Sequence, residues 1–234
     1  MKAIILNSGM GTRLKELTEN NPKSLVKITN EDSIFSRTIK ILSQLDIDEF
    51  IITTGYLSQV LVDYCNEKFP EINFTFVHNP VYDKTNYIKS LDLIGNIDDD
   101  IILLHGDLVF DVLVAEKIFD SSESCVVVDS TVSLPKDDFK AKIINNKIDY
   151  IGVDYFEDDA IACQPFYKLI NKDWKLWKNE IKKFCNNDQT DVYAENALNK
   201  LTDRIKIMPL DVKGLLCMEI DNKDDLNHIK EILK

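Results

Sequence analysis

Short apolar runs alternate with segments of helical periodicity through the first 130 residues, and this alternation restricts the fold more than any other feature. The apolar runs are as long as strands and occupy residues 2–7, 50–53, 73–77, 101–104 and 125–128. Between them, apolar residues recur at helical spacing over residues 34–45, 60–69 and 111–119. Strands that alternate with helices form mostly parallel sheets covered on both faces. The sequence therefore predicts an α/β protein with three layers.

The pattern changes after residue 130. Residues 141–145 and 147–152, joined by Asn145-Asn146, are typical of a hairpin, which predicts a small antiparallel extension of the sheet. Further elements are expected as helices at 171–185 and 193–201, strands near 205–209 and 215–220, and a helix from Lys223. No stretch resembles a flexible linker. We expect one domain over residues 1–234, with a core at 1–130 and a lid and edge at 131–234.

Composition and charge exclude several kinds of protein. No apolar run approaches the roughly 20 residues that a membrane-spanning helix needs, and the N-terminal run is too short for a secretory signal, so we expect a cytoplasmic protein. Five cysteines lack the C-x-x-C spacing, and three histidines are too scattered to predict a zinc site. The net charge of −12 argues against binding to nucleic acid or to an anionic membrane. Residues 1–30, however, carry +3, so a small anion could bind there.

The loop after the first strand is suited to phosphate. Gly9 and Gly11 let backbone amides approach an anion closely, and Arg13 can grip phosphate oxygens with two hydrogen bonds. Lys23 follows Pro22, which keeps it out of a continuing helix, and completes a pair of cations. Taken separately, the glycines could form an ordinary turn and both cations could be solvated.

The combination is more specific than its parts. The segment LNSGMGTRLKELTENNPKSLVKI resembles the G-x-G-T/S-R…P-K-x-L pattern of the nucleotidyltransferase (nucleoside-diphosphosugar pyrophosphorylase-like) family. The resemblance implies a Rossmann-like sheet whose first loop wraps a nucleoside triphosphate. Arg13 and Lys23 are then the catalytic cations that neutralise the α-phosphate and the leaving pyrophosphate. The loop residues expected to contact the nucleotide are Leu6, Asn7, Ser8, Gly9, Met10, Gly11 and Thr12.

Two aspartates follow strands and are candidates for metal binding. Asp107 comes after the run at 101–104, and Asp221 ends the run at 215–220. Either one alone could equally cap a helix or belong to a loop. The family resemblance implies that both hold Mg²⁺, with Mn²⁺ as an alternative, and Glu219 either assists or is an ordinary strand residue. Mg²⁺ commonly binds one or two carboxylates together with substrate phosphates.

A narrower resemblance suggests which nucleotide is used. The segments TGY, NPVYDKTNYIKSL, DFKAKI, ACQPFYK and VYAENALNKL are similar to the phosphocholine and 2-aminoethylphosphonate cytidylyltransferases. This resemblance implies CTP as the donor. It also implies six further residues near the nucleotide, which are Gly55, Tyr56, Asn79, Thr85, Asn86 and Ser90. Tyr56 could instead be an ordinary half-buried ring.

The same resemblance implies an acceptor with an anionic head and an amine-bearing tail. Phosphocholine, 2-aminoethylphosphonate and the phosphoglutamine activated in capsule phosphoramidate synthesis fit this description, and we favour the last. Glu195 could pair with an ammonium group. The acceptor-binding candidates are Lys142, Gln164, Tyr193, Glu195 and Asn196. The aromatic acceptor motif of phosphocholine enzymes is not evident, and VYAEN stands in its place.

We therefore expect transfer of CMP from CTP to a small phosphorylated or phosphonate acceptor, with release of pyrophosphate. A sugar-1-phosphate nucleotidyltransferase that uses UTP or dTTP is the alternative enzyme. A nucleotide-sensing regulatory domain would not need both Asp107 and Asp221. A glycosyltransferase would normally need a D-x-D site, and GDL supplies one aspartate. A homodimer is one option for the assembly.

Overall fold

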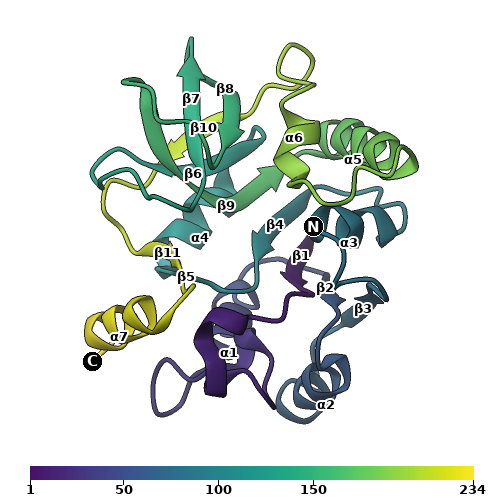
Figure 1. Ribbon diagram of the computed structural model, residues 1–234, viewed down its shortest axis with the longest axis vertical. Helices are drawn as coiled ribbons and strands as arrows, with labels where there is room; N and C mark the ends of the chain where they lie inside the picture. Colours follow the sequence, from purple (N-terminus) through teal and green to yellow (C-terminus); the bar gives the residue numbers. More distant parts are fainter.

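A nine-stranded sheet forms the centre of the computed structural model, which describes residues 1–234 (Figure 1). Its main path has the order β10-β6-β9-β4-β1-β2-β3, and the β7–β8 hairpin joins it through β9. Strands β1 to β4 are mutually parallel, whereas β9 is antiparallel to both β4 and β6. A second sheet pairs β5 with β11. The strands are β1 (Lys2–Asn7), β2 (Glu49–Thr54), β3 (Phe74–His78), β4 (Ile101–His105), β5 (Leu108–Phe110), β6 (Cys125–Asp129), β7 (Lys140–Ile144), β8 (Lys147–Gly152), β9 (Ala160–Leu169), β10 (Met208–Asp211) and β11 (Cys217–Glu219).

Helices cover both faces of the sheet, as the alternating pattern predicts. Ile4, Ile101 and Leu103 face a core shared with Trp174 and Trp177, whereas Ala3, Ile5 and Leu104 face a second core with helices from the first half. The α/β sandwich with a mostly parallel sheet and a small antiparallel part is thus confirmed. The helices are α1 (Ile34–Leu42), α2 (Ser58–Lys68), α3 (Tyr87–Leu93), α4 (Val112–Asp120), α5 (Asn171–Asn186), α6 (Ala194–Leu198) and α7 (Lys223–Ile232), with 3₁₀ turns η1 (Thr12–Leu17) and η2 (Lys23–Leu25).

Capping residues define where two helices begin. Ser33 accepts a hydrogen bond from the amide of Ser36 (3.1 Å), and the Ser36 hydroxyl accepts one from the Ser33 amide (2.9 Å). Asn222 and Asp225 form the same reciprocal arrangement at the start of α7. Such caps satisfy amides that have no partner inside the helix. The cap at α7 also ends the segment that carries Asp221, so this helix start determines where that carboxylate lies.

The antiparallel strand β9 is the main element that the sequence patterns missed. It lies between β4 and β6 and contains Pro165, which cannot donate to a sheet ladder. Its register with β6 shifts between Val126 and Val127, next to the proline, so the proline is accommodated at an irregularity. A proline inside an apolar segment argues against a central strand, so local pattern alone does not predict β9.

The helices of this chain are all too short or too polar to cross a lipid bilayer.

Candidate active site

The loop after β1 borders a hollow at the carboxyl ends of the parallel strands. Gly11 has a φ of 63°, and a Cβ at this position would lie 2.7 Å from the Cβ of Lys23. A side chain here would strain the backbone and displace Lys23. Gly55 is similarly constrained, because a Cβ would lie 2.5 Å from the carbonyl oxygen of Ser8. The two glycines therefore allow two segments to pack directly against the loop.

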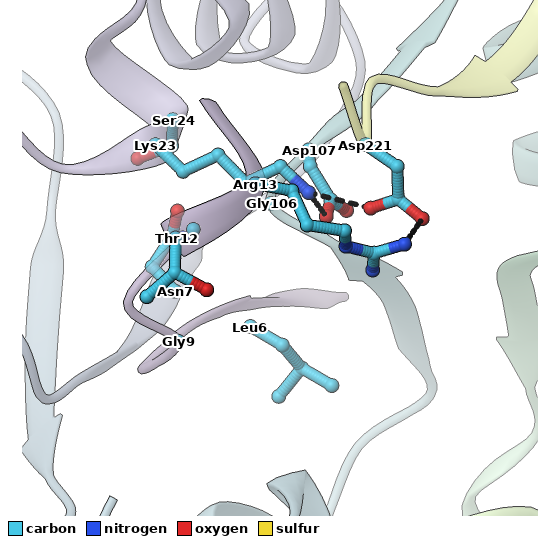
Figure 2. Close-up of a pocket in the computed structure, with 11 residues that line it drawn as sticks. Leu6, Asn7, Gly9, Thr12, Arg13, Lys23, Ser24, Gly106, Asp107 and Asp221 are labelled. Atoms are coloured by element: carbon cyan, nitrogen blue, oxygen red, sulfur yellow. Dashed lines mark hydrogen bonds and ion pairs between the residues drawn. The ribbon is translucent and has the colours of Figure 1, made fainter. Parts of the chain in front are cut away.

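Two cations and two carboxylates meet in this hollow of about 230 Å³ (Figure 2). The Lys23 ammonium nitrogen lies 2.5 Å from Asp107 Oδ2 and 2.8 Å from Asp221 Oδ1. Arg13 Nη1 lies 3.0 Å from Asp221 Oδ2. Asp107 follows β4 and Asp221 follows β11, whereas both cations come from the first 25 residues. The fold thus brings together charged groups from the beginning, middle and end of the chain.

Mutual attraction keeps these groups charged despite their burial. Burial alone would lower the pKa of Lys23, but the carboxylates of Asp107 and Asp221 outweigh it and hold the pKa above its ordinary value. Burial would raise the pKa of Asp107, but Lys23 and His105 hold it below its ordinary value. Arg13 is mostly exposed, with 63% of its side-chain surface accessible. Its guanidinium is therefore free to contact a ligand in the hollow.

A buried histidine–carboxylate pair lies beside Asp107. His105 Nδ1 is 2.8 Å from Glu219 Oε1. Burial alone would lower the pKa of His105, but the Glu219 carboxylate raises it to about 9. Burial and the neighbouring charge of Asp107 raise the pKa of Glu219 to about 7. The two side chains consequently form an ion pair between these pH values.

The donor atoms around Asp107 fit a divalent cation. One atom from each of His105, Asp107 and Glu219 lies within 4.8 Å of the other two. Asp107 Oδ1 is buried and has no hydrogen-bond partner. Oxygen ligands are those that Mg²⁺ prefers, and a histidine nitrogen is compatible with Mn²⁺. Asp107 and Asp221 both bind one ammonium nitrogen, so the two carboxylates face each other around a single position for a cation.

A second, larger hollow of about 540 Å³ adjoins the first. A chain of hydrogen bonds forms its floor: Asn79 Nδ2 donates to Thr85 Oγ1 (3.2 Å) and to Ser90 Oγ (3.1 Å), and Ser90 donates to Ser8 Oγ (2.9 Å). Ser8 in turn donates to Thr53 Oγ1 (3.1 Å). The chain connects the glycine loop to the segment before α3. It therefore links four of the residues expected to contact the nucleotide into one network, namely Ser8, Asn79, Thr85 and Ser90.

A carboxylate lies buried behind the wall of the second hollow. Glu195 on α6 is 2% exposed, accepts a hydrogen bond from the Tyr167 hydroxyl (2.8 Å) and also accepts one from the Tyr87 hydroxyl. The Tyr87 ring lies 4.6 Å from the His105 ring and 6.0 Å from the Tyr193 ring, measured between centroids. Glu195 thus carries negative charge among neutral hydroxyl donors and aromatic rings. Such surroundings favour a cation more than an anion.

The structure gathers most, but not all, of the residues singled out from the sequence. Gly55 and Tyr56 border the glycine loop, and the Tyr56 hydroxyl donates to the carbonyl oxygen of Glu19 (2.6 Å). Gln164 is buried on β9 with its side-chain oxygen unpaired, and Asn196 is exposed on α6. The remaining ones line one or both hollows or lie in the loop between them: Leu6, Asn7, Ser8, Gly9, Met10, Gly11, Thr12, Arg13, Lys23, Asn79, Thr85, Asn86, Ser90, Asp107 and Asp221.

Lys142 is the candidate that the structure separates from the others. It lies on the outer hairpin, 4.0 Å from Asp149, in a different hollow bordered by Tyr150 and Tyr155. The reason is its place in the sheet, because Lys142 lies opposite Ala160 at the first residue of β9, whereas β4 pairs with residues 166–169 of that strand. Lys140, two residues earlier, is buried instead. The expectation that Lys142 contacts the acceptor therefore has no geometric support.

Several residues of the second hollow were not expected individually. They are Tyr82, Asp83, Lys84, Tyr87, His105 and Asp191. Tyr82 to Tyr87 lie within NPVYDKTNYIKSL, so that segment already carried a signal for them. His105 and Asp191 are polar residues next to predicted elements, and nothing in their spacing marks them.

Comparison with known proteins agrees with this geometry. The family described as nucleotidyl transferase matches residues 2–133. A choline-phosphate cytidylyltransferase of Streptococcus pneumoniae is 28% identical over 245 aligned residues, which cover 100% of this chain and 99% of that protein. A CTP:phosphoglutamine cytidylyltransferase of Campylobacter jejuni is 32% identical over 135 residues, covering 55% of this chain and 52% of that protein.

A solved structure extends the likeness to the whole chain. The CTP:phosphocholine cytidylyltransferase from Streptococcus pneumoniae superposes with a TM-score of 0.80 at 25% identity. The match covers 100% of this chain and 99% of that one. The antiparallel elements after residue 130 therefore belong to the shared architecture as well.

Proposed function

Because this chain belongs to the nucleotidyl transferase family, and is an enzyme of the cytidylyltransferase type, we propose that it transfers CMP from CTP to a small phosphorylated or phosphonate acceptor. Pyrophosphate is the second product. The observation that carries the proposal is the meeting of Arg13, Lys23, Asp107 and Asp221 beside the glycine loop. Cations for a triphosphate and carboxylates for a metal ion are both needed for this chemistry.

In the proposed reaction, an acceptor phosphate oxygen attacks the α-phosphorus of CTP from the side of Tyr193 and Glu195. A bond forms between that oxygen and the α-phosphorus, and the bond from the α-phosphorus to the bridging oxygen of pyrophosphate breaks. Arg13 and Lys23 stabilise the negative charge on the phosphate oxygens and on the leaving pyrophosphate. No general base is required, because a phosphate acceptor is already ionised at neutral pH.

Asp107 and Asp221 are the residues we assign to the metal ion, with Glu219 and His105 close enough to support them. Bound Mg²⁺, or Mn²⁺ as an alternative, supplies charge neutralisation and orientation of the phosphates. Without a ligand, Lys23 neutralises the same two carboxylates. We therefore infer that Lys23 exchanges these carboxylates for phosphate oxygens when CTP and the metal bind.

The chemistry of the neighbouring residues indicates where each substrate binds. We assign the nucleotide to the glycine loop, to the network from Ser8 to Thr85, and to the neighbouring Gly55 and Tyr56. The acceptor is assigned to the surroundings of Tyr193 and Glu195, contributed by residues 131–234. A buried carboxylate with aromatic neighbours is suited to an ammonium-bearing tail. This supports phosphocholine, 2-aminoethylphosphonate or phosphoglutamine, and phosphoglutamine, whose known use is in capsule synthesis, remains our first choice.

The alternative is a sugar-1-phosphate nucleotidyltransferase that uses UTP or dTTP, because the glycine loop and its two cations serve any triphosphate. The buried carboxyl group of Glu195 favours a cationic acceptor over a neutral sugar.

One experiment separates these assignments. Pyrophosphate release is measured with CTP, UTP and dTTP, each against phosphocholine, 2-aminoethylphosphonate, phosphoglutamine and glucose 1-phosphate in the presence of Mg²⁺. We expect turnover with CTP and one amine-bearing acceptor. Turnover only with glucose 1-phosphate and UTP or dTTP would establish the alternative, and no release with any pair would reject both.

A further inference from the structure

Strand β7 follows the loop that leaves β6 (Figure 1), and its first residue is a buried lysine. Lys140 has no exposed surface. Its ammonium donates to backbone carbonyl oxygens of Pro135 (3.1 Å), Lys136 (3.3 Å), Asp138 (2.9 Å) and Val153. The first three belong to residues 130–139, which we call the cover loop, and Val153 follows β8. The ammonium therefore joins the cover loop to the end of the hairpin.

Packing alone does not explain a lysine at this position. A buried ammonium is costly unless it is fully hydrogen-bonded, and here every bond is made to backbone carbonyls. Burial lowers the pKa of Lys140 below its ordinary value. The ring of Phe156 lies 3.9 Å from the ammonium nitrogen and adds a cation–π contact. A methionine would fill similar space without burying a charge. The role of the lysine is therefore to bind these carbonyl oxygens.

The cover loop reaches the site just described. Since β9 is antiparallel to both β4 and β6, the strands β4 and β6 end at the same side of the sheet. The Phe139 ring lies 5.1 Å from the Tyr193 ring and 6.4 Å from the His105 ring, between centroids.

We propose that Lys140 is a positioning residue, whose ammonium holds the cover loop so that Phe139 closes the acceptor side of the site. The proposal rests on the cytidylyltransferase function proposed above. Lys140 touches neither hollow, so it acts through the loop and makes no contact with the substrates. Losing the ammonium should loosen residues 130–139 and weaken acceptor binding, while leaving the glycine loop and CTP binding intact.

The chain provides a matched control. Lys168 is also buried, at 7% exposure, and its ammonium also donates to two backbone carbonyls, those of Phe119 and Ser121 (both 2.5 Å). A Phe119 ring lies 5.8 Å away. Lys168 pairs with Ile102 and Cys125, near the amino ends of β4 and β6, so it lies at the opposite side of the sheet. Lys168→Met therefore tests the loss of a buried, carbonyl-bound lysine away from the site.

Hydrogen exchange tests the loop directly and needs no turnover. The Cys163 amide donates to the carbonyl oxygen of Phe139 (3.0 Å), so its exchange reports whether the end of the cover loop stays in place. In the full-length Lys140→Met protein this amide should exchange at least about tenfold faster, because loss of the ammonium bonds makes local opening easier. In Lys168→Met the rise should instead be confined to the region around residues 119–121. Unchanged exchange at Cys163 in Lys140→Met would overturn the proposal, whether or not the wild type turns over any acceptor.

Kinetics tests the consequence for the reaction. With CTP, Mg²⁺ and whichever of phosphocholine, 2-aminoethylphosphonate or phosphoglutamine the wild type uses, Lys140→Met should raise the acceptor KM about tenfold, equivalent to about 1.4 kcal/mol. The CTP KM should change less than about twofold, and Lys168→Met should change neither KM. An acceptor KM equal to that of the wild type would overturn the proposal. A wild type that turns over none of the three acceptors would refute the proposed function and leave the exchange result to decide the loop.

Two further variants test the same proposal if Lys140→Met does not fold. Phe156→Ala removes the exposed ring beside the ammonium and should raise exchange and acceptor KM in the same direction by a smaller factor. Lys140→Arg retains the charge and the donors and should restore part of the protection at Cys163 that methionine loses. Wild-type exchange at Cys163 in Phe156→Ala, together with no rescue by arginine, would count against the ammonium as the cause.

Discussion

At the scale of single residues, the site depends on charges that neutralise one another before any ligand arrives. The Lys23 ammonium lies between Asp107 and Asp221, and burial would be unfavourable for any of the three alone. The sequence predicted that these three residues belong to the site, because the two aspartates follow strands and the lysine follows a proline. The contact between Lys23 and the carboxylates was not predictable, since it joins segments far apart in the chain.

Replacing Lys23 with methionine should have two separable effects. Turnover should fall by about 10² to 10³, because the cation that stabilises the transition state is lost. Mn²⁺ binding without nucleotide, followed by electron paramagnetic resonance, should tighten by at least about tenfold, because two carboxylates lose their competing cation. Lys27→Met, an exposed lysine of the same segment, is the control. Near-normal turnover in Lys23→Met would refute its role.

The His105–Glu219 pair predicts how stability depends on pH. The pKa of His105 is about 9 in the folded protein and 6.5 when unfolded. A base with a raised pKa stabilises the fold fully below its unfolded value, and this stabilisation is lost as the pH rises through the folded value. The pKa of Glu219 is also raised on folding, from 4.5 to about 7. Protonation of this group therefore also stabilises the folded state at the lower pH. Stability from this pair should therefore decline from pH 4.5 to 9.

Urea unfolding of wild type and His105→Asn measures this effect. Between pH 6.5 and 9 the free energy of unfolding of the wild type should fall more than that of the variant, by about 3 kcal/mol at most. Glu219→Gln removes the partner carboxylate and should also reduce the difference. Parallel pH curves for wild type and both variants would contradict the pKa assignment.

At the scale of elements, the short helix α6 positions the acceptor-side residues, and its neighbour α5 orients it. Helix α6 has five residues and cannot be stable alone. Trp177 on α5 is fully buried, and its indole nitrogen donates to the Ala194 carbonyl (2.9 Å), next to Glu195. The helical pattern predicted both helices, with α6 ending earlier than expected. Their docking onto each other depends on a hydrogen bond that no periodicity reveals.

Trp177→Phe should therefore destabilise the protein more than Trp174→Phe. Both residues are buried on α5, but only the Trp177→Phe substitution removes an indole donor, the one that binds the Ala194 carbonyl oxygen. The additional loss should be about 1–3 kcal/mol in the free energy of unfolding. We also expect a raised acceptor KM only in Trp177→Phe, because α6 carries Tyr193 and Glu195. Equal losses in the two variants would argue against the orienting role.

At the scale of the whole molecule, the site forms only when the two halves of the chain close on each other. Asp107 follows β4 in the main sheet, whereas Asp221 follows β11, which pairs with β5 in the smaller sheet. The β5–β11 pair therefore determines the spacing of the two carboxylates. The assignment of nucleotide binding to residues 1–130 and acceptor binding to residues 131–234 stays a prediction, and the metal carboxylates come from both parts.

If the two carboxylates share one ion, their loss should not be additive. Asp107→Asn and Asp221→Asn should each lower kcat by about 100-fold or more, and the double variant should be little worse than the more severe single one. Excess EDTA should abolish wild-type turnover, and Mg²⁺ or Mn²⁺ should restore it. Multiplicative losses in the double variant, or turnover that survives EDTA, would show that the carboxylates do not act through a common ion.

The sequence by itself determined the layered α/β fold, the phosphate-binding loop and the identity of four charged residues. These follow from local patterns, because strand and helix periodicity, the glycines and Pro22 act over a few neighbouring residues. Only the tertiary structure decided that β9 enters the sheet despite Pro165, that Lys23 bridges two carboxylates, and that Lys140 is buried while Lys142 lies in an outer hollow. These features depend on contacts between segments that are distant in the sequence, and no local pattern specifies such contacts.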